Sequence, residues 1–197
     1  MIGIINYGAG NIRSVSNALN RLSVPHFVSN DCNELNKADK LIFPGVGEAR
    51  SAMDALVHNG LTDWLKEVTV PFLGICLGMQ LLFEHTTERA TECLSIISGT
   101  NERFNSGMSQ LKVPHMGWNQ VQQDGKNPLF SGIISSENFY FVHSYYAPVV
   151  PVTIGITDYG VQFTSAIQQK NYYGVQFHPE KSGKAGLRIL KNFVEVC

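Results

Sequence analysis

Four short apolar runs alternate with segments of helical periodicity in the first half of this chain. The runs are residues 2–5, 25–28, 40–43 and 70–75. Each has the length of a buried strand, and between them apolar residues recur every three or four positions, as from Ile12 to Leu22. Strands that alternate with helices predict a parallel sheet with helices on both faces. Ligands of such sheets bind beyond the carboxyl ends of the strands.

The second half of the chain favours antiparallel strands. Between about residues 94 and 177 the apolar runs are short, rich in β-branched and aromatic residues, and divided by turns such as Asp124-Gly125. Strands are predicted at 118–121, 139–143, 152–156 and 163–167, and a last helix at 182–196. We expect a three-layer α/β fold, in which helices flank a mixed, mostly parallel central sheet, with an additional antiparallel β patch in the second half. The length fits a single domain over residues 1–197.

Composition narrows the classes of function. A net charge of −1 and the lack of a basic run give no electrostatic case for nucleic acid binding. No apolar run approaches the ~20 residues of a membrane span, and the amino terminus begins as a strand and not as a signal peptide. The cysteines have no metal-ligand spacing; they are Cys32, Cys76, Cys93 and Cys197. We expect a cytoplasmic protein with reduced thiols and with neither metal nor cofactor.

A cysteine follows the fourth apolar run, in the order Gly74-Ile75-Cys76-Leu77-Gly78-Met79-Gln80. This order predicts a strand, a tight turn and a helix over 77–83, with the thiol at the apex as in a nucleophile elbow. The flanking glycines relieve crowding, and the amino terminus of the helix favours a thiolate. A lone cysteine after an apolar run is more often a small buried hydrophobe, so the interpretation depends on a base elsewhere in the chain.

The candidate base lies about a hundred residues later. The strand-like run 172–177 ends in His178-Pro179-Glu180, so a nucleophile, a base and an orienting carboxylate each follow a strand. Such constellations carry out acyl transfer. The loop Pro44-Gly45-Val46-Gly47 also follows a strand, and its backbone N–H groups could hold an oxyanion together with that of Leu77. Taken alone, this loop is better explained as a plain β-to-α turn, which glycine also serves.

Three further clusters are less specific. The turn Tyr7–Asn11 has only part of a dinucleotide fingerprint, because the third glycine and a downstream acidic residue are missing, and we reject a nucleotide site there. The segments 114–119 and 140–145 are rich in aromatic residues and methionine, which suit either an interface or a core. Their histidines, His115 and His143, lack acidic or cysteine companions, so metal binding is not expected.

Together these motifs resemble those of the class I glutamine amidotransferases, over essentially the whole chain. The resemblance implies that Cys76 attacks the carboxamide of glutamine, that His178 moves the proton and that Glu180 orients the imidazole. The implied oxyanion-binding residues are Gly45, Val46, Gly47 and Leu77. The implied glutamine-binding groups are Gln80 and the backbone of His143, Ser144 and Tyr145.

Segments 114–119 and 140–145 are similar to one branch of this family, whose members form a heterodimer with a (β/α)₈-barrel cyclase subunit. In that branch ammonia passes through the barrel to a nucleotide in histidine biosynthesis. The resemblance implies a docking face that includes Met116, Trp118 and Lys181. It also implies that the glutaminase, when isolated, is poorly active until partner and ligand rearrange the Gly45-to-Gly47 loop.

Three alternatives remain open at this stage. Related glutaminases supply ammonia to a cyclase-like partner that amidates a surface sugar, and their sequences would be nearly identical. An inactive module that only binds a partner is disfavoured, because all three triad residues are present. A different cysteine hydrolase, such as a γ-glutamyl peptidase, is disfavoured by the segments 114–119 and 140–145.

Overall fold

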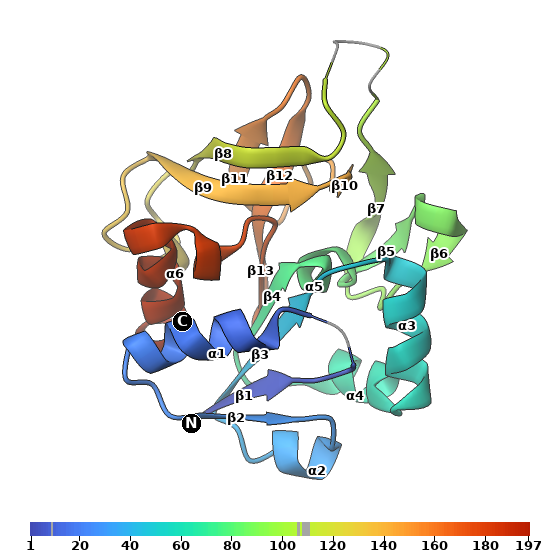
Figure 1. The fold of residues 1–197 in the computed structure, drawn as a ribbon, viewed down its shortest axis with the longest axis vertical. Coiled ribbons are helices and arrows are strands. Elements are labelled where there is room, and N and C mark those ends of the chain that lie inside the picture. Colours follow the sequence, from blue (N-terminus) through green and yellow to red (C-terminus); the bar gives the residue numbers. More distant parts are fainter. Residues whose placement is uncertain (9, 106, 108–110) are drawn as a thin grey trace.

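The computed structural model of residues 1–197 describes all positions except 9, 106 and 108–110, and its described part is built on a nine-stranded mixed sheet (Figure 1). Across the sheet the strands follow the order β2 (His26–Ser29), β1 (Ile2–Ile5), β3 (Lys40–Gly45), β4 (Phe72–Cys76), β13 (Tyr172–Val175), β12 (Gln162–Gln169), β11 (Thr153–Asp158), β8 (His115–Gln122) and β9 (Ser136–His143). Pairing is parallel from β2 to β13 and antiparallel from β13 to β9. The predicted α/β class is confirmed, and the antiparallel patch is continuous with the parallel half.

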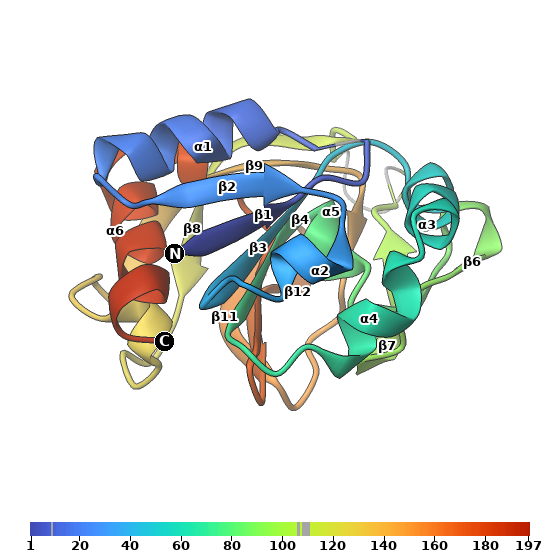
Figure 2. The ribbon, with the colours of Figure 1, turned by 90° about the horizontal axis from the view of Figure 1, so that it is seen from below.

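Helices cover both faces of the parallel half (Figure 2). On one face lie α1 (Ile12–Arg21) and α6 (Gly183–Glu195), and on the other lie α2 (Cys32–Leu35), α3 (Ala49–His58) and α4 (Leu61–Glu67). Side chains alternate along a strand, so each strand feeds two cores. In β3, Ile42 packs in the core under α1 and α6, while its neighbours Leu41 and Phe43 pack in the core under α3 and α4. Within the described residues, no helix is long and apolar enough to cross a bilayer.

The predicted helix over 77–83 is wrong beyond its first turn. The observed α5 covers only Leu77–Gln80, and the chain then enters a second, smaller sheet of β10 (Tyr145–Tyr146), β7 (Ile97–Arg103), β5 (Phe83–Thr86) and β6 (Thr91–Glu92). Leu81, Leu82 and Phe83 are all fully buried. A short run buried on every side has no amphipathic period, so its sequence cannot distinguish a helix from a strand.

Other boundaries shift for local reasons. The third strand continues past residue 43 because Pro44 and Gly45 still pair with Ile75 and Cys76 of β4. The last helix begins after Ser182 as expected, but this side chain does not cap it. Its hydroxyl instead accepts the N–H of Tyr140 at 2.9 Å and donates to the carbonyl of His178 at 2.7 Å. The described part of the chain also contains short 3₁₀ turns, which are η1 (Glu88–Ala90), η2 (Pro128–Phe130) and η3 (Pro179–Lys181).

Candidate active site

The turn at Cys76 is held in a rarely populated backbone conformation. Cys76 ends β4 with φ +55° and ψ −110°, a region that residues with a Cβ avoid. Such outliers persist where the surroundings fix them, and they cluster at functional sites. Because α5 is one turn long, its dipole adds less to thiolate formation than the longer predicted helix would.

Close approach of backbones explains the glycines around this turn. A Cβ on Gly78 would lie 2.0 Å from the carbonyl oxygen of Phe43, and one on Gly74 would lie 2.6 Å from the carbonyl oxygen of Gly78. A Cβ on Gly45 would lie 2.5 Å from the nitrogen of Gly78. Glycine at these positions therefore lets α5 lie directly on β3 and β4, which brings the turn at Cys76 against the Gly45-to-Gly47 loop.

His178 and Glu180 form a buried pair at the end of the neighbouring strand. Since β13 pairs in parallel with β4, His178 and Cys76 follow adjacent strands at the same edge of the sheet. His178 Nδ1 lies 2.8 Å from Glu180 Oε1, and their side chains are 2% and 1% exposed. Burial opposes an imidazolium, but the charges of a Cys76 thiolate and of Glu180 outweigh it and raise the pKa of His178 to about 10. Among the described residues, His178 Nε2 has no hydrogen-bond partner.

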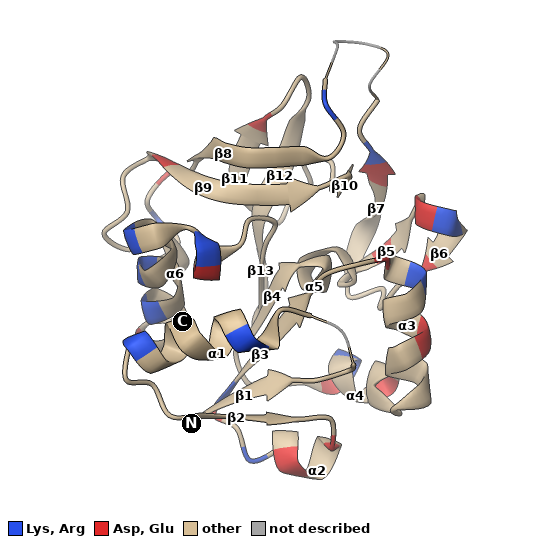
Figure 3. Ribbon diagram, viewed as in Figure 1, with Lys and Arg blue, Asp and Glu red and all other residues tan. Residues whose placement is uncertain are grey.

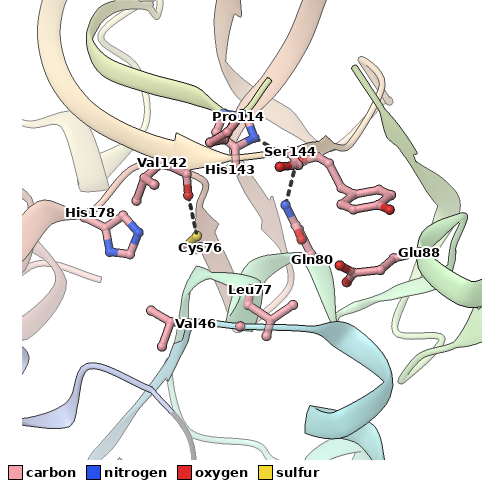
Figure 4. Close-up of a pocket in the computed structure, with 12 residues that line it drawn as sticks. Val46, Cys76, Leu77, Gln80, Glu88, Pro114, Val142, His143, Ser144 and His178 are labelled. Atoms are coloured by element: carbon pink, nitrogen blue, oxygen red, sulfur yellow. Dashed lines mark hydrogen bonds between the residues drawn. The ribbon is translucent and has the colours of Figure 1, made fainter. Parts of the chain in front are cut away.

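One cavity of about 310 Å³ collects most of the predicted residues. Those lining it are Val46, Gly47, Cys76, Leu77, Gln80, His143, Ser144, Tyr145 and His178. His178, Cys76, Gln80 and Glu88 follow one another along this cavity (Figure 4). Two predicted residues lie behind its wall: Glu180 bonds to His178, and Gly45 pairs with Cys76 in the sheet.

Gln80 is held by two acceptors inside the protein. Its amide nitrogen donates to the carbonyl of Tyr145 at 2.7 Å and to Gln176 Oε1 at 2.8 Å. Both hydrogens are thereby used, so Gln80 can offer a ligand only its oxygen. Sequence reasoning missed Gln176, which is fully buried and whose Nε2 donates to Cys76 Sγ at 3.6 Å. Its place in the run 172–177, two residues before His178, was the available signal.

Two buried histidines support the same carbonyl group. His143 Nδ1 donates to the Tyr145 carbonyl at 2.7 Å, and His143 Nε2 lies 3.0 Å from His115 Nδ1. Asn119 Nδ2 lies 3.3 Å from the other nitrogen of His115. Burial lowers the pKa of His143 to about 3 and that of His115 to about 4, so both rings are neutral at pH 7. The two histidines therefore hold the Tyr145 carbonyl in place, and hydrogen bonds occupy the ring nitrogens that a metal would need.

Glu88 is an acidic group in the cavity that no sequence motif indicated. It lies in η1, next to Arg89 and Ala90, whose φ angles are 52° and 48°. Burial raises the pKa of its carboxyl, although the N–H of Ala49 opposes the shift. The arrangement places a carboxylate along the cavity from Cys76, where a cationic group of a ligand could meet it.

An exposed apolar patch adjoins the cavity. Met116 and Trp118 are 62% and 58% exposed, and they pair across β8 and β9 with Val142 and Tyr140. Val142 lines the cavity, so the patch reaches its wall. Lys181 Nζ lies 5.9 Å from the centre of the Tyr140 ring. Strand β8 carries no charged residue (Figure 3). We call Met116, Trp118 and Tyr140 the apolar patch.

Comparison with known proteins identifies the family of this chain. A family model described as glutamine amidotransferase class-I matches residues 4–197. The imidazole glycerol phosphate synthase subunit HisH of Bacteroides fragilis is 49% identical over 195 residues, 99% of each chain, and that of Mannheimia succiniciproducens is 47% identical over 98% of each. The crystal structure of a glutamine amidotransferase from Thermotoga maritima shares the fold, with a TM-score of 0.66 at 15% identity over 98% of this chain and 80% of that one. This chain therefore belongs to the class I glutamine amidotransferases and, within them, to the HisH family.

Proposed function

We propose that this enzyme hydrolyses glutamine with a Cys76–His178–Glu180 triad and supplies the ammonia to a cyclase subunit of imidazole glycerol phosphate synthase. The observation that carries the proposal is the common cavity of Cys76 and His178, with Glu180 fixed behind the imidazole at 2.8 Å. A strained nucleophile turn beside a buried imidazole–carboxylate pair suits acyl transfer. We also propose that residues 1–197 form a single domain.

The reaction follows from these positions. His178 takes the proton of the Cys76 thiol and, because its pKa is raised to about 10, holds that proton as an imidazolium at neutral pH. The sulfur attacks the carboxamide carbon of glutamine, and His178 protonates the nitrogen as the C–N bond breaks and ammonia leaves. A water then loses a proton to His178 and attacks the thioester. Glutamate is released and the thiolate–imidazolium pair is restored.

The α-ammonium group of glutamine has a candidate partner in the cavity. We assign Glu88 to the α-ammonium group, since a buried cation requires an opposite charge. Gln80 offers its oxygen, and the backbone of Ser144 and Tyr145 completes the site. The oxyanion is assigned to backbone N–H groups of the Gly45-to-Gly47 loop and of Leu77, where Gly47 has a φ of +96° that glycine alone adopts without strain.

We assign the apolar patch, with Lys181, to docking of a (β/α)₈-barrel cyclase. Met116 and Trp118 are more than half exposed beside the cavity, and exposed aromatic and methionine side chains are typical of an interface. The heterodimer would bury ~1,600 Å² or more and would pass ammonia to the cyclase without release to solvent. Its lyase reaction would form imidazole glycerol phosphate and aminoimidazole carboxamide ribonucleotide in the cytoplasm.

Reconstitution tests the proposal. The protein is mixed with a cognate histidine-pathway cyclase, and product formation is followed with glutamine or with ammonium as the nitrogen source. We expect Cys76→Ala to abolish glutamine-dependent turnover and to retain ammonium-dependent turnover. Loss of both activities would make Cys76 a structural residue. A wild-type protein that supports no glutamine-dependent turnover with this cyclase would instead favour a sugar-amidating partner.

A further inference from the structure

We propose that Glu88 couples glutamine binding to the loop that holds the oxyanion, and that Arg89 and Glu48 are positioning residues for this coupling. The inference rests on the proposed function, because it assigns a second task to the carboxylate assigned above to the ammonium group. It concerns the contact between η1 and the start of α3.

The Glu88 carboxylate has two different neighbours. Its Oε2 accepts the N–H of Ala49 at 2.8 Å, and Ala49 is the first residue of α3, two positions after Gly47. The side chain also lines the cavity and extends toward Gln80 (Figure 4). A carboxylate can accept hydrogen bonds on both oxygens at once. One oxygen can thus hold the loop segment while the other holds a ligand.

A second set of contacts joins the same two segments. Arg89 Nε lies 2.7 Å from Glu48 Oε1, and Arg50 Nη2 donates to the carbonyls of Arg89 at 3.2 Å and of Ala90 at 3.3 Å. Charged residues of both signs accordingly gather where η1 meets the start of α3 (Figure 3). Residues 48–50 are therefore tied to residues 88–90 by both side chains and backbone.

The backbone of η1 is held in an unfavourable conformation. Arg89 and Ala90 are consecutive non-glycine residues with φ angles of 52° and 48°. This left-handed conformation is unfavourable for residues with a Cβ and persists only where the surroundings fix it. The contacts to residues 48–50 help to fix it, together with Thr86 and Thr91, whose hydroxyls hydrogen-bond to the Glu88 backbone. Any change in the Gly45-to-Gly47 loop that moves residues 48–50 would therefore disturb Glu88.

Charge determines the direction of the coupling. Burial raises the pKa of Glu88, because the surroundings disfavour the ionised carboxylate that accepts from Ala49. A bound ammonium group would favour the ionised carboxylate and would strengthen its bond to the Ala49 N–H. Glutamine would thus fix the loop segment when it binds. By reciprocity, a partner that rearranges the loop would change the affinity for glutamine.

The test compares kcat and KM for glutamine hydrolysis in the complete complex with the cyclase. Glu88→Gln loses the charge but keeps an oxygen for Ala49, so KM should rise ~10- to 100-fold and kcat should fall less than in Glu88→Ala. Glu88→Ala loses both, so kcat should fall a further ~5-fold. Arg89→Ala leaves the cavity intact, so kcat should fall ~5-fold at constant KM, and Arg89→Lys should restore it.

A surface ion pair elsewhere supplies the control. Lys191 lies 3.9 Å from Glu195 on α6, and Lys191→Ala should change neither parameter. Equal kcat values for Glu88→Gln and Glu88→Ala, or an Arg89→Ala variant with wild-type kcat, would overturn the coupling. If Glu88→Ala does not fold, the Arg89 pair alone decides. Failure of the proposed function is recognised separately, as a wild-type complex that does not hydrolyse glutamine.

Discussion

Replacement of Gly78 by alanine should displace the nucleophile turn. A Cβ at this position would lie 2.0 Å from the carbonyl oxygen of Phe43 and 3.1 Å from its carbonyl carbon, whereas real Cβ contacts stay beyond 3.0 Å. Both obstacles are backbone atoms of β3, so no side chain can rotate away. The strand and α5 must therefore separate by roughly 1 Å, a shift of the size that impairs catalytic alignment.

The magnitude follows from that displacement. Overpacking of a well-packed interior costs about 1–3 kcal/mol, and the backbone obstacle places Gly78→Ala near about 3 kcal/mol. For a chain of 197 residues this lowers Tm by about 6–12 °C. Misplacement of Cys76 and Leu77 against the Gly45-to-Gly47 loop by about 1 Å should reduce kcat for glutamine about 100-fold.

Thermal unfolding and glutaminase kinetics of the complex with the cyclase measure the two effects. Gly125→Ala is the matched control, because its φ is +74° and a Cβ there meets nothing within 4 Å. That variant should lose about 1–2 kcal/mol through backbone strain and keep wild-type turnover. A Gly78→Ala protein with wild-type Tm and wild-type kcat would refute the close-approach argument.

Three further predictions concern the histidines and the patch. Burial lowers the pKa of His143 to about 3 and that of His115 to about 4, so just below pH 6.5 only the unfolded chain binds a proton on each of these two rings. The contribution of the two neutral rings to the free energy of unfolding is therefore complete above pH 6.5. It decreases by up to about 2.7 kcal/mol for each unit by which the pH is lowered. Denaturant titrations at several pH values should show a shallower slope for His115→Phe, and equal slopes would contradict the neutral pair. Glu180→Gln should reduce kcat ~1,000-fold and move the alkaline limb of the pH–rate profile to lower pH, because the carboxylate helps to raise the pKa of His178; an unmoved limb would contradict this role. Trp118→Ala should weaken cyclase binding ~10- to 100-fold in calorimetric titrations with little change in Tm, since the ring is 58% exposed; unchanged affinity would exclude it from the interface.

The parallel half of the fold could be predicted because its signals are local. Short apolar runs and helical spacing identify β1 to β4 and predict the parallel pairing that the structure shows. Cys76 and His178 could be predicted as partners because each stands where a buried strand ends, and β13 then pairs with β4. The sequence motifs and the strand pairing therefore indicate the same two residues.

The remaining parts of the site depend on contacts between distant residues. Glu88 lies in a turn whose left-handed angles are not favoured by Arg89 or Ala90, so no turn signal marks it. His115 and His143 meet because β8 and β9 pair in register, which their separate sequences do not specify. The start of strand β5 in the smaller sheet was predicted as helix because residues 81–83 are buried on all sides and have no period.

Covalent trapping of the nucleophile tests the central claim most directly. A diazoketone analogue of glutamine is incubated with the complex, and the labelled residue is located by peptide mass spectrometry. We expect one label, on Cys76, that appears in step with the loss of glutamine-dependent activity, is slowed by glutamine and is absent in Cys76→Ser. Inactivation with the label on Cys32, Cys93 or Cys197, or labelling of Cys76 without loss of activity, would contradict the account.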